Sequence, residues 1–247
     1  MFRYLKSLPR VLYIYLKDKL ILKKRVAILM YHSVSDDNNE FFTVSSKNFM
    51  SQMNYLYENN YVILSLHDLI EYINSKKKIP KKSVVLTLDD GYEDNYLTVF
   101  PMLKKYNFPA TIFLITGLVG NKNYSNRGIK LPMLDWGQIQ EMHSSGLIDF
   151  QPHTVSHPRL SISLPNEVIY EMEDSKKEIE RRLGKKCTLF AYPKGDYNIS
   201  TIEIAGRIFD GAVTTDMGFT NFRSSLLSLR RNSVHSQTDS LTFKLKI

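Results

Sequence analysis

The chain has 247 residues, of which 43% are hydrophobic, which is enough to bury a sizeable core in one or two α/β domains. The formal net charge is +8, but residues 1–25 hold eight Lys or Arg and one Asp, so the remaining residues are nearly neutral. This balance argues against nucleic-acid binding, which needs a basic stripe on the folded domain. The lone Cys187 excludes an intramolecular disulfide and leaves the compartment open.

Residues 1–25 form a basic amphipathic pattern. At helical spacing, leucines share one face and basic residues the opposite one: Leu5, Leu8, Leu12, Leu16 and Leu20 against Arg3, Lys6, Arg10, Lys17 and Lys24. Such a helix suits an anionic membrane surface, or it packs on the domain itself. The apolar stretch is too short for a cleavable signal peptide or a transmembrane span. We therefore expect a cytoplasmic protein, peripheral at the inner face of the membrane.

Short apolar runs, typical of strands, follow in chain order at residues 25–31, 61–64, 83–88, 109–115, 146–150, 188–192, 211–215 and 230–234. Amphipathic segments typical of helices lie between several of them, at residues 46–60, 66–77, 96–107, 135–146 and 164–184. This alternation predicts a parallel sheet in a complete or incomplete (β/α) barrel, with a doubly wound open sheet as the alternative. No linker interrupts the pattern, so we expect one domain over residues 26–247.

Ionisable residues follow several of these strands at their carboxyl ends. His32 follows the first run, Asp89 and Asp90 follow the run at 83–88, and His153 and His157 lie just beyond the run at 146–150. Barrels and open α/β sheets gather their active sites at this end of the strands. The two adjacent carboxylates therefore need not repel each other in isolation, because other strands can supply a cation between them.

The pair His153 and His157 is the best candidate for the rest of such a cation site. Three intervening residues place both imidazoles on one side of a turn. With one carboxylate they form a two-His-one-carboxylate set, which suits a divalent metal with positions left open for water and substrate. An H-x-x-x-H pair alone also arises by chance on a surface, so the neighbouring acid pair carries much of the argument.

The same residues carry a family resemblance. The segments "TLDDG" at 87–91, "HTVSH" at 153–157, "FAYPKGDY" at 190–197 and "LMYHSVSDD" at 29–37 resemble the polysaccharide deacetylases of carbohydrate esterase family 4, which contain the NodB homology domain. The nearest likeness is to the bacterial poly-N-acetylglucosamine deacetylase branch, over about residues 26–235. The resemblance implies a distorted (β/α) barrel of about seven strands that hydrolyses N-acetyl groups of amino sugars.

The resemblance also implies roles. Asp89 would be the general base, and Asp90, His153 and His157 would hold one divalent metal ion, expected to be Zn²⁺, with Ni²⁺, Co²⁺ or Fe²⁺ as alternatives. A backbone N–H near Pro193 and Lys194 would stabilise the oxyanion. Thus one carboxylate would hold the metal while its neighbour handles the proton.

The sequence departs from the family pattern at the general acid and in the third motif. The late L-x-H motif has no clear match, so we favour His32, whose equivalent comes early in permuted branches, with His235 as the alternative acid. Ala191 and Lys194 stand where an arginine and a tyrosine are usual. Asp135 is expected to cap a helix, and Trp136 either packs or stacks on a sugar ring.

The leading hypothesis is a metal-dependent N-deacetylase of a surface glycan or its lipid-linked precursor. The extension at residues 1–25 would bind an anionic membrane. One alternative is a carbohydrate-binding protein with a degenerate deacetylase barrel, and another is an O-acetyl esterase or deformylase on the same fold. The sequence does not distinguish N-acetyl from O-acetyl or formyl groups, and it names neither the sugar, the linkage, the native metal nor the oligomeric state.

Overall fold

The central sheet of this protein is parallel. The computed structural model describes residues 25–38, 40–126 and 129–247, so nearly all of the predicted N-terminal extension lies outside the described residues. Six strands form the sheet in the order β12-β1-β5-β6-β9, with β4 pairing with the start of β5. Their bounds are β1 (Ala27–Tyr31), β4 (Val62–Leu64), β5 (Ser83–Leu88), β6 (Ala110–Leu114), β9 (Ile148–Pro152) and β12 (Asn232–Ser233). The predicted α/β class is confirmed, and all eight predicted strands are present, the other two being β10 (Leu189–Ala191) and β11 (Gly211–Val213).

The strands alternate between an outer and an inner face. In β5, Val84, Leu86 and Leu88 belong to the apolar cluster that the surrounding helices complete. Val85 belongs to a second cluster that contains residues from strands on the far side, including β10 and β11. This two-residue period places the next inward position after Thr87 at Asp89, directly beyond the strand. The pleat of β5 therefore directs Asp89 into the interior.

The strands follow a barrel-like path. β10 pairs with β11, and Leu229 forms a parallel bridge with Val213 of β11 before the same segment pairs with β1 through Asn232. Between β9 and β10 the described residues form no strand ladder. Two residues of β9 and the segment after α7 (Pro165–Leu183) instead supply side-chain contacts there.

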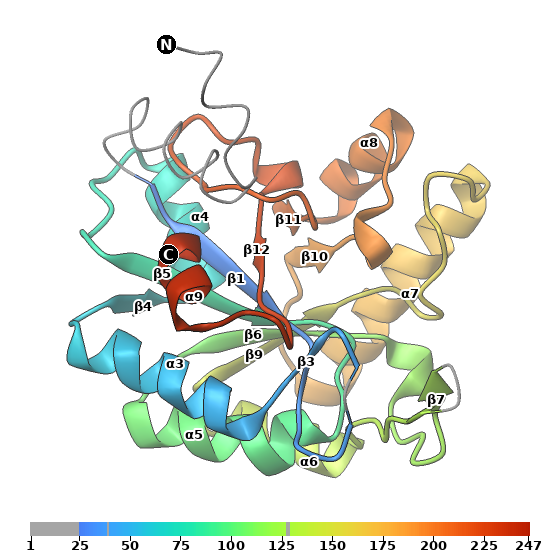
Figure 1. Ribbon diagram of the computed structural model, residues 1–247. Coiled ribbons are helices and arrows are strands. Elements are labelled where there is room, and N and C mark those ends of the chain that lie inside the picture. The colour runs from blue at the N-terminus through green and yellow to red at the C-terminus, as the bar shows by residue number, and fades with distance from the viewer. Residues whose placement is uncertain (1–24, 39, 127–128) are drawn as a thin grey trace, which may run out of the picture.

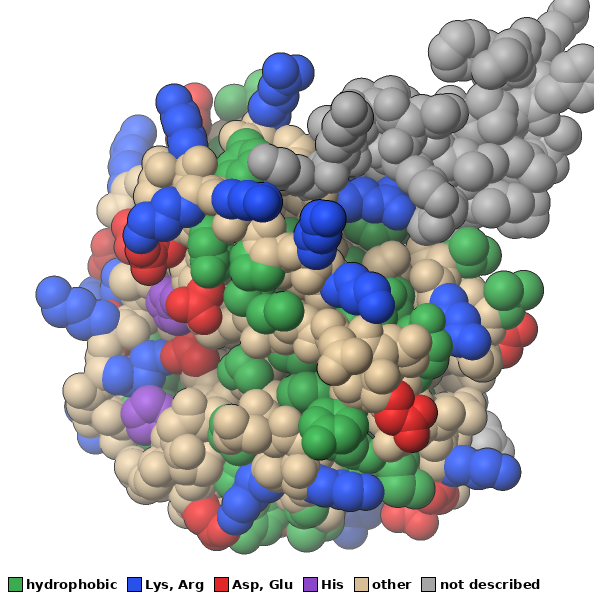
Figure 2. All heavy atoms as spheres, turned by 90° about the vertical axis from the view of Figure 1, so that its left-hand side faces the viewer, with side chains coloured by type: hydrophobic (Ala, Val, Ile, Leu, Met, Phe, Trp, Pro, Cys, Tyr) green, Lys and Arg blue, Asp and Glu red, His purple; other side chains and the backbone are tan. Residues whose placement is uncertain are grey.

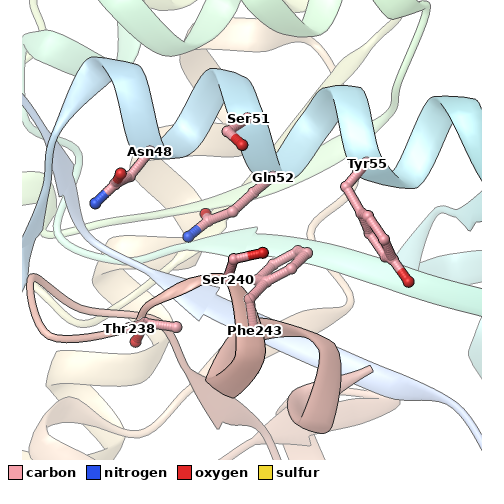
Figure 3. Close-up of a pocket in the computed structure, with 7 residues that line it drawn as sticks. All are labelled: Asn48, Ser51, Gln52, Tyr55, Thr238, Ser240 and Phe243. Carbon is pink, nitrogen blue, oxygen red and sulfur yellow. The ribbon is translucent and has the colours of Figure 1, made fainter.

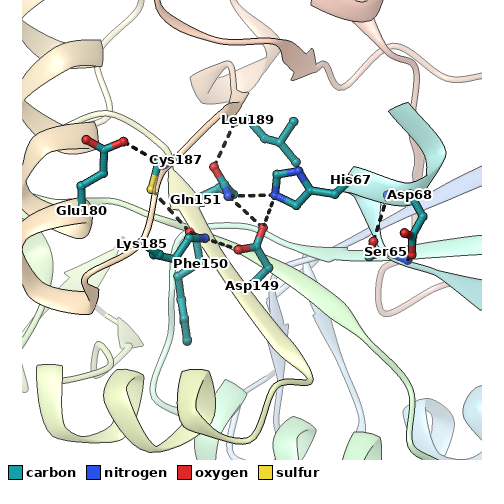
Figure 4. A network of polar contacts seen from close by, with 10 residues as sticks. All are labelled: Ser65, His67, Asp68, Asp149, Phe150, Gln151, Glu180, Lys185, Cys187 and Leu189. Atoms are coloured by element: carbon teal, nitrogen blue, oxygen red, sulfur yellow. Dashed lines mark hydrogen bonds and ion pairs between the residues drawn. The ribbon is translucent and has the colours of Figure 1, made fainter. Parts of the chain in front are cut away.

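A polar network occupies this junction at the starts of the strands (Figure 4). Gln151 Oε1 accepts from the Leu189 amide at 3.0 Å, in place of a strand-to-strand backbone bond. Gln151 also donates to Asp149, which is paired with His67 at 3.2 Å and with Lys185. His67 thus lies towards the start of β9, at the opposite end of the strand from His153.

Helices cover the outer face of the sheet (Figure 1). Residues of α3 (Ser46–Glu58), α5 (Phe100–Tyr106), α6 (Trp136–Ser144) and α7 (Pro165–Leu183) complete the outer cluster. α4 (Leu66–Asn74) instead places Leu66, Leu69, Ile70 and Ile73 in the inner cluster, where it covers the end at which the strands start. α8 (Ile199–Ile208) packs on β10 and β11 in a third cluster. The site is therefore left at the opposite end.

Local sequence fixes several helix boundaries. Capping boxes start α4 at Ser65, α6 at Asp135 and α8 at Asn198, which confirms Asp135 as the expected cap. The π-helix η1 (Asn95–Val99) precedes α5, whose Pro101 has no N–H to donate, so the widened turn absorbs the missing bond.

The C-terminal helix α9 (Ser240–Lys246) packs against α3. Phe243 is buried between them, and polar side chains of both elements line a pocket of about 100 Å³ beside it (Figure 3). Ligand sites usually enclose about 300–1,000 Å³, so this hollow is a packing gap. Neither α8 nor α9 was among the predicted helices.

Candidate metal centre and active site

Three side chains converge at the carboxyl ends of β5 and β9. Asp90 Oδ1 lies 3.6 Å from His153 Nε2 and 3.6 Å from His157 Nε2, and the three atoms all lie within 4.8 Å of one another. Two ligands held about 2.1 Å from one Zn²⁺ at a tetrahedral angle lie about 3.4 Å apart. Asp90 Oδ1 is buried and has no hydrogen-bond partner among the described residues. A divalent cation fits this set, because it would satisfy that oxygen.

Hydrogen bonds to the outer atoms aim these ligands. His153 Nδ1 lies 2.7 Å from the Ala191 carbonyl, to which it donates, and this leaves the Nε2 lone pair for a metal. The Tyr92 hydroxyl donates to Asp90 Oδ2 at 2.8 Å, which leaves Oδ1 facing the histidines. Burial, followed by the charge of Asp90, raises the pKa of Tyr92, so this hydroxyl stays a donor.

Both histidines are held neutral, as metal ligation requires. Burial is the main cause for His153, whose pKa is lowered despite the nearby carboxylates. Burial, and then the neighbouring His153, lower the pKa of His157 to about 4. The imidazoles are therefore ready to bind a cation at neutral pH without first losing a proton.

A buried glutamate holds the loop that carries the histidines. Glu171 of α7 accepts from the backbone amides of Val155 and Ser156 at 2.7 and 2.9 Å, and also from the Ser156 hydroxyl. Thr154 and His157 both have positive φ, at 70° and 62°. Such conformations are costly for residues other than glycine, so the contacts from Glu171 offset strain in this loop.

Asp89 has a different partner from Asp90. Arg231 grips it with two hydrogen bonds, from Nη1 to Oδ1 at 2.7 Å and from Nη2 to Oδ2 at 2.6 Å, and both side chains are buried. Burial alone would raise the pKa of Asp89, but the Arg231 guanidinium outweighs burial and holds that pKa well below its usual range. Asp89 is thus an ionised carboxylate beside the metal set.

The turn after β5 separates the two carboxylates. Asp90 and Gly91 both have positive φ, at 73° and 79°, so the chain reverses sharply directly after Asp89. A Cβ on Gly91 would lie 2.6 Å from Leu114 Cδ2, which explains the glycine. The result is that the two carboxylates face different partners: Asp89 faces the Arg231 guanidinium, and Asp90 faces the imidazoles of His153 and His157.

His32 and the turn at Pro193–Gly195 flank this centre. His32 is close enough for its charge to act on Asp89, and its buried Nδ1 has no hydrogen-bond partner among the described residues. Its ring lies 5.9 Å from Phe42, which stacks on Tyr92 at 5.8 Å. Lys194 has φ of 59° and is near enough for its charge to act on His157.

The other two predicted site residues have their own partners. His235 stacks on Phe41 with ring centroids 4.2 Å apart. Trp136 packs against the outer cluster beneath the Arg182 guanidinium, 5.1 Å from the ring centre. An acid role for His235 and a sugar contact for Trp136 stay predictions.

Sequence reasoning missed Arg231, Tyr92 and Glu171. Arg231 lies in a predicted strand, "RRNSV", where one of two arginines must face inward, and a buried guanidinium needs a carboxylate. The arginine pair in this predicted strand could therefore have indicated a buried partner for one of the aspartates. Tyr92 follows the glycine of the aspartate motif, but nothing in the sequence shows that its hydroxyl turns back to Asp90.

This fold, with an Asp/His/His set that could hold a metal ion at the carboxyl ends of its strands, is typical of a metal-dependent hydrolase. The sequence profile of the polysaccharide deacetylase family matches residues 76–208. The chain belongs to that family. It is therefore a deacetylase that uses a divalent metal ion, as the resemblance implied.

Individual relatives agree. The chain is 34% identical over 208 residues to YxkH of Bacillus subtilis (strain 168), named for the same family, covering 84% of this chain and 70% of that protein. It is 32% identical over 190 residues to the poly-β-1,6-N-acetyl-D-glucosamine N-deacetylase of Staphylococcus aureus (strain MRSA252), covering 72% of this chain and 63% of that one. The Streptococcus pyogenes deacetylase PplD, solved with acetate, superposes with a TM-score of 0.79 at 31% identity, over 90% of this chain and 98% of that one.

Proposed function

We propose that this deacetylase removes N-acetyl groups from an amino-sugar glycan, or from the precursor of one, and releases acetate with Zn²⁺ at the Asp90, His153 and His157 set. The observation that carries the proposal is the ionised Asp89 next to the Asp90, His153 and His157 set, in which the buried Asp90 Oδ1 has no hydrogen-bond partner among the described residues. The named activity of the S. aureus relative supports a poly-N-acetylglucosamine type of substrate.

The chain's own residues divide the chemistry. A divalent cation held by this set would lower the pKa of water and polarise the acetamide carbonyl. Asp89 takes the proton from the attacking water. Pro193 has no N–H, so the Lys194 amide is the candidate donor to the oxyanion. His32 gives a proton to the leaving amine, since its Nδ1 is free of other partners within the described residues.

The alternatives named from the sequence differ in what they need. A carbohydrate-binding protein with a degenerate barrel would need no base, yet Asp89 is buried and ionised by a dedicated arginine. An O-acetyl esterase or a deformylase would need the same groups, because hydroxide attacks all three carbonyls. Product analysis separates these two from an N-deacetylase.

The form and place of the substrate also belong to the proposal. The leucine and lysine pattern of residues 1–25 supports a peripheral association with an anionic membrane, and hence a lipid-linked saccharide in the cytoplasm. Across residues 25–38, 40–126 and 129–247, no helix combines the length and the apolar character needed to cross a bilayer.

The test is a substrate panel given to the Zn²⁺-loaded protein. It contains β-1,6-linked N-acetylglucosamine oligomers, the same oligomers with N-formyl groups, O-acetylated glucosamine oligomers and a nucleotide-linked N-acetyl sugar. Mass spectrometry should show a loss of about 42 Da for each sugar deacetylated in the N-acetyl oligomers, together with a matching amount of released acetate. If only the O-acetylated oligomers or only the N-formylated oligomers lose their acyl groups, the protein is an O-acetyl esterase or a deformylase and not an N-deacetylase.

A further inference from the structure

His32 lies directly beyond the end of β1. The strand runs from the side of the molecule that Figure 2 shows, where Lys and Arg side chains gather over the upper half of the view, to the end that carries the candidate metal centre. Ile28 of β1 belongs to the inner apolar cluster, and the two-residue period of a strand directs Met30 and His32 to the same face. The imidazole of His32 therefore turns towards the interior, where its charge acts on Asp89.

The hydrogen-bond ladder between β1 and β5 ends one residue before His32. Tyr31 is the last residue of β1 in register with β5, and its carbonyl accepts from the Asp89 amide at 3.0 Å. The next residue, Asp90, has a φ of 73°, so the chain turns away from β1 at this point. Strand β5 therefore supplies no donor for the His32 carbonyl, and a backbone carbonyl shielded from water needs one.

Asn95 supplies that donor. Its side-chain Nδ2 donates to the His32 carbonyl at 2.9 Å and to Asp94 Oδ1 at 2.8 Å, and Asn95 is fully buried. Both of these neighbours are acceptors, so the donating end of the amide must face them, which fixes its orientation. One N–H of the amide thus holds the backbone at His32, and the other holds the amide itself against Asp94.

Asp94 ties down the residues that follow His32. Its Oδ2 accepts from the Ser33 hydroxyl at 2.6 Å, and its carboxylate also accepts from the Val34 backbone amide. These two residues form strand β2 (Ser33–Val34), which packs against η1. Asp94 and Asn95 together therefore hold three consecutive residues at the end of β1.

The π-helix η1 places the two anchoring side chains. Asn95 is its first residue and Asp94 its N-cap, and the Phe100 amide reaches back to the Asn95 carbonyl. Such a turn is wider than an α-helical turn, and π-helical turns are frequent at functional sites. One short segment, residues 89–95, thus contains the candidate base, a candidate metal ligand and the anchor of His32. It therefore sets the separation between the candidate base and the candidate acid.

The position of the His32 ring depends on this anchor more than that of His153 would. His153 is held through Nδ1 by the Ala191 carbonyl, whereas the buried Nδ1 of His32 has no hydrogen-bond partner among the described residues. The backbone that carries His32 must then fix its ring. A displacement of about 1 Å in a reacting group can cost about 10²-fold in rate.

We propose that Asn95 is a positioning residue of this deacetylase, which holds the His32 carbonyl and thereby fixes the imidazole at the place from which it protonates the leaving amine. The proposal rests on the proposed function for the acid role of His32. Asn95 acts through His32 and is not itself a catalytic residue.

A double-mutant cycle tests this action through His32. The variants are Asn95→Leu, which keeps the branching of the side chain and removes the amide, His32→Ala, and the two together, each loaded with Zn²⁺ and given N-acetylglucosamine oligomers. We expect Asn95→Leu to lower kcat by at least about tenfold with little change in KM. In the His32→Ala background the same change should have no further effect, because the ring that it positions is gone. An equal loss in both backgrounds would overturn the proposal.

A substrate with a good leaving group gives a second readout. The phenolate of para-nitrophenyl acetate departs without a proton, so hydrolysis of this ester needs the base and not the acid. Asn95→Leu should therefore hydrolyse it within about twofold of the wild-type rate. A loss on the ester as large as the loss on the oligomers would also overturn the proposal.

Gln52→Leu is the matched control for removal of a buried amide. Gln52 accepts from the Tyr31 hydroxyl at 2.9 Å, on the outer face of the sheet and next to His32 in the chain. This variant should lose stability and keep the wild-type kcat on the oligomers. A fall in kcat equal to that of Asn95→Leu would show that general destabilisation causes both losses, and would overturn the proposal.

The placement of the ring is measured apart from activity by NMR of the Zn²⁺-loaded protein labelled with ¹³C at the histidine Cε1 atoms. The His32 signal should move in Asn95→Leu and stay in place in Gln52→Leu, whereas those of His153 and His157 should stay in both. An unmoved His32 signal in Asn95→Leu would overturn the proposal. A moved signal in a protein whose wild type releases no acetate from the oligomers would contradict the proposed function alone, so the two failures are distinguishable.

Discussion

The buried pair of Arg231 and Asp89 makes the sharpest prediction. Arg231→Met keeps the length of the side chain and removes the two hydrogen bonds to Asp89, at 2.7 and 2.6 Å. Removing one partner of a buried ion pair leaves an uncompensated charge and costs about 3–5 kcal/mol of unfolding free energy. We expect the variant to lose stability in this range at neutral pH.

The pH dependence of this loss has a definite sign. In the wild type, the pKa of Asp89 is depressed, so the pair stabilises the fold above the unfolded pKa of about 3.9 and is lost only as the pH falls below it. Without the guanidinium, no positive charge offsets the effect of burial. The pKa of Asp89 should therefore rise by at least about 1–3 units, which is the amount by which a neighbouring guanidinium lowers it. The stability gap between the two proteins should therefore shrink as the pH falls through that raised pKa.

Catalysis should report the same shift. In Arg231→Met, kcat/KM should fall at an acidic pH where the wild type is still active, because Asp89 must be ionised to accept a proton and its raised pKa then limits activity. The control is Arg230→Met, which removes an exposed arginine next to it in the chain. Urea unfolding at two pH values and a pH–rate profile check both parts. An unshifted acid limb with a stability loss below about 1 kcal/mol would refute the role given to Arg231.

Further predictions concern the metal loop, its pH dependence and one turn. Glu171→Ala should weaken Zn²⁺ binding by about 10–100-fold in calorimetric titration, because the loop amides lose their acceptor, whereas wild-type affinity in this variant would contradict that support. Metal-free protein should lose stability as the pH falls from about 6.5 towards 4, since His157 stays neutral when folded and protonates when unfolded, and a flat profile by thermal unfolding would contradict this. Gly195→Ala should lower the free energy of unfolding by more than about 2 kcal/mol, because its Cβ would lie 1.9 Å from Thr215 Oγ1. At Gly146 an added Cβ would meet no atom within 4 Å, so Gly146→Ala should cost only about 1 kcal/mol for its positive φ. Equal losses in the two variants, measured by urea unfolding, would refute the clash.

The strands and the candidate metal-ligand set could be predicted from the sequence because their signals are local. Each strand is a short apolar run, and the ligands sit in short motifs directly after β5 and β9. The helix α8 was missed because Ile199, Thr201, Ile202 and Ile204 are β-branched and favour strands. Packing in the third apolar cluster overrides that preference.

The partners of the ligands could not be predicted in the same way. Arg231 and Asp89 are 142 residues apart, and only the pairing of β12 with β1 and of β1 with β5 brings them together. Glu171 is the one acid of α7 that turns inward to the histidine loop among several in a charged helix. Such contacts depend on the exact register of strands and helices, which residue patterns do not specify.

In the proposed mechanism the adjacent carboxylates divide the work: Asp90 holds the metal and Asp89 moves the proton. The most direct measurement compares Zn²⁺ affinity and acetate release in Asp89→Asn and Asp90→Asn. Because Asp89→Asn leaves the buried Arg231 without its carboxylate, the double variant Asp89→Asn/Arg231→Met serves as the control for that unpaired charge. We expect Asp89→Asn to bind Zn²⁺ like the wild type but to release acetate about 10²–10⁴-fold more slowly. Asp90→Asn should lose Zn²⁺ binding itself. Wild-type activity in Asp89→Asn, or equal loss of metal affinity in both single variants and in the control, would contradict the account.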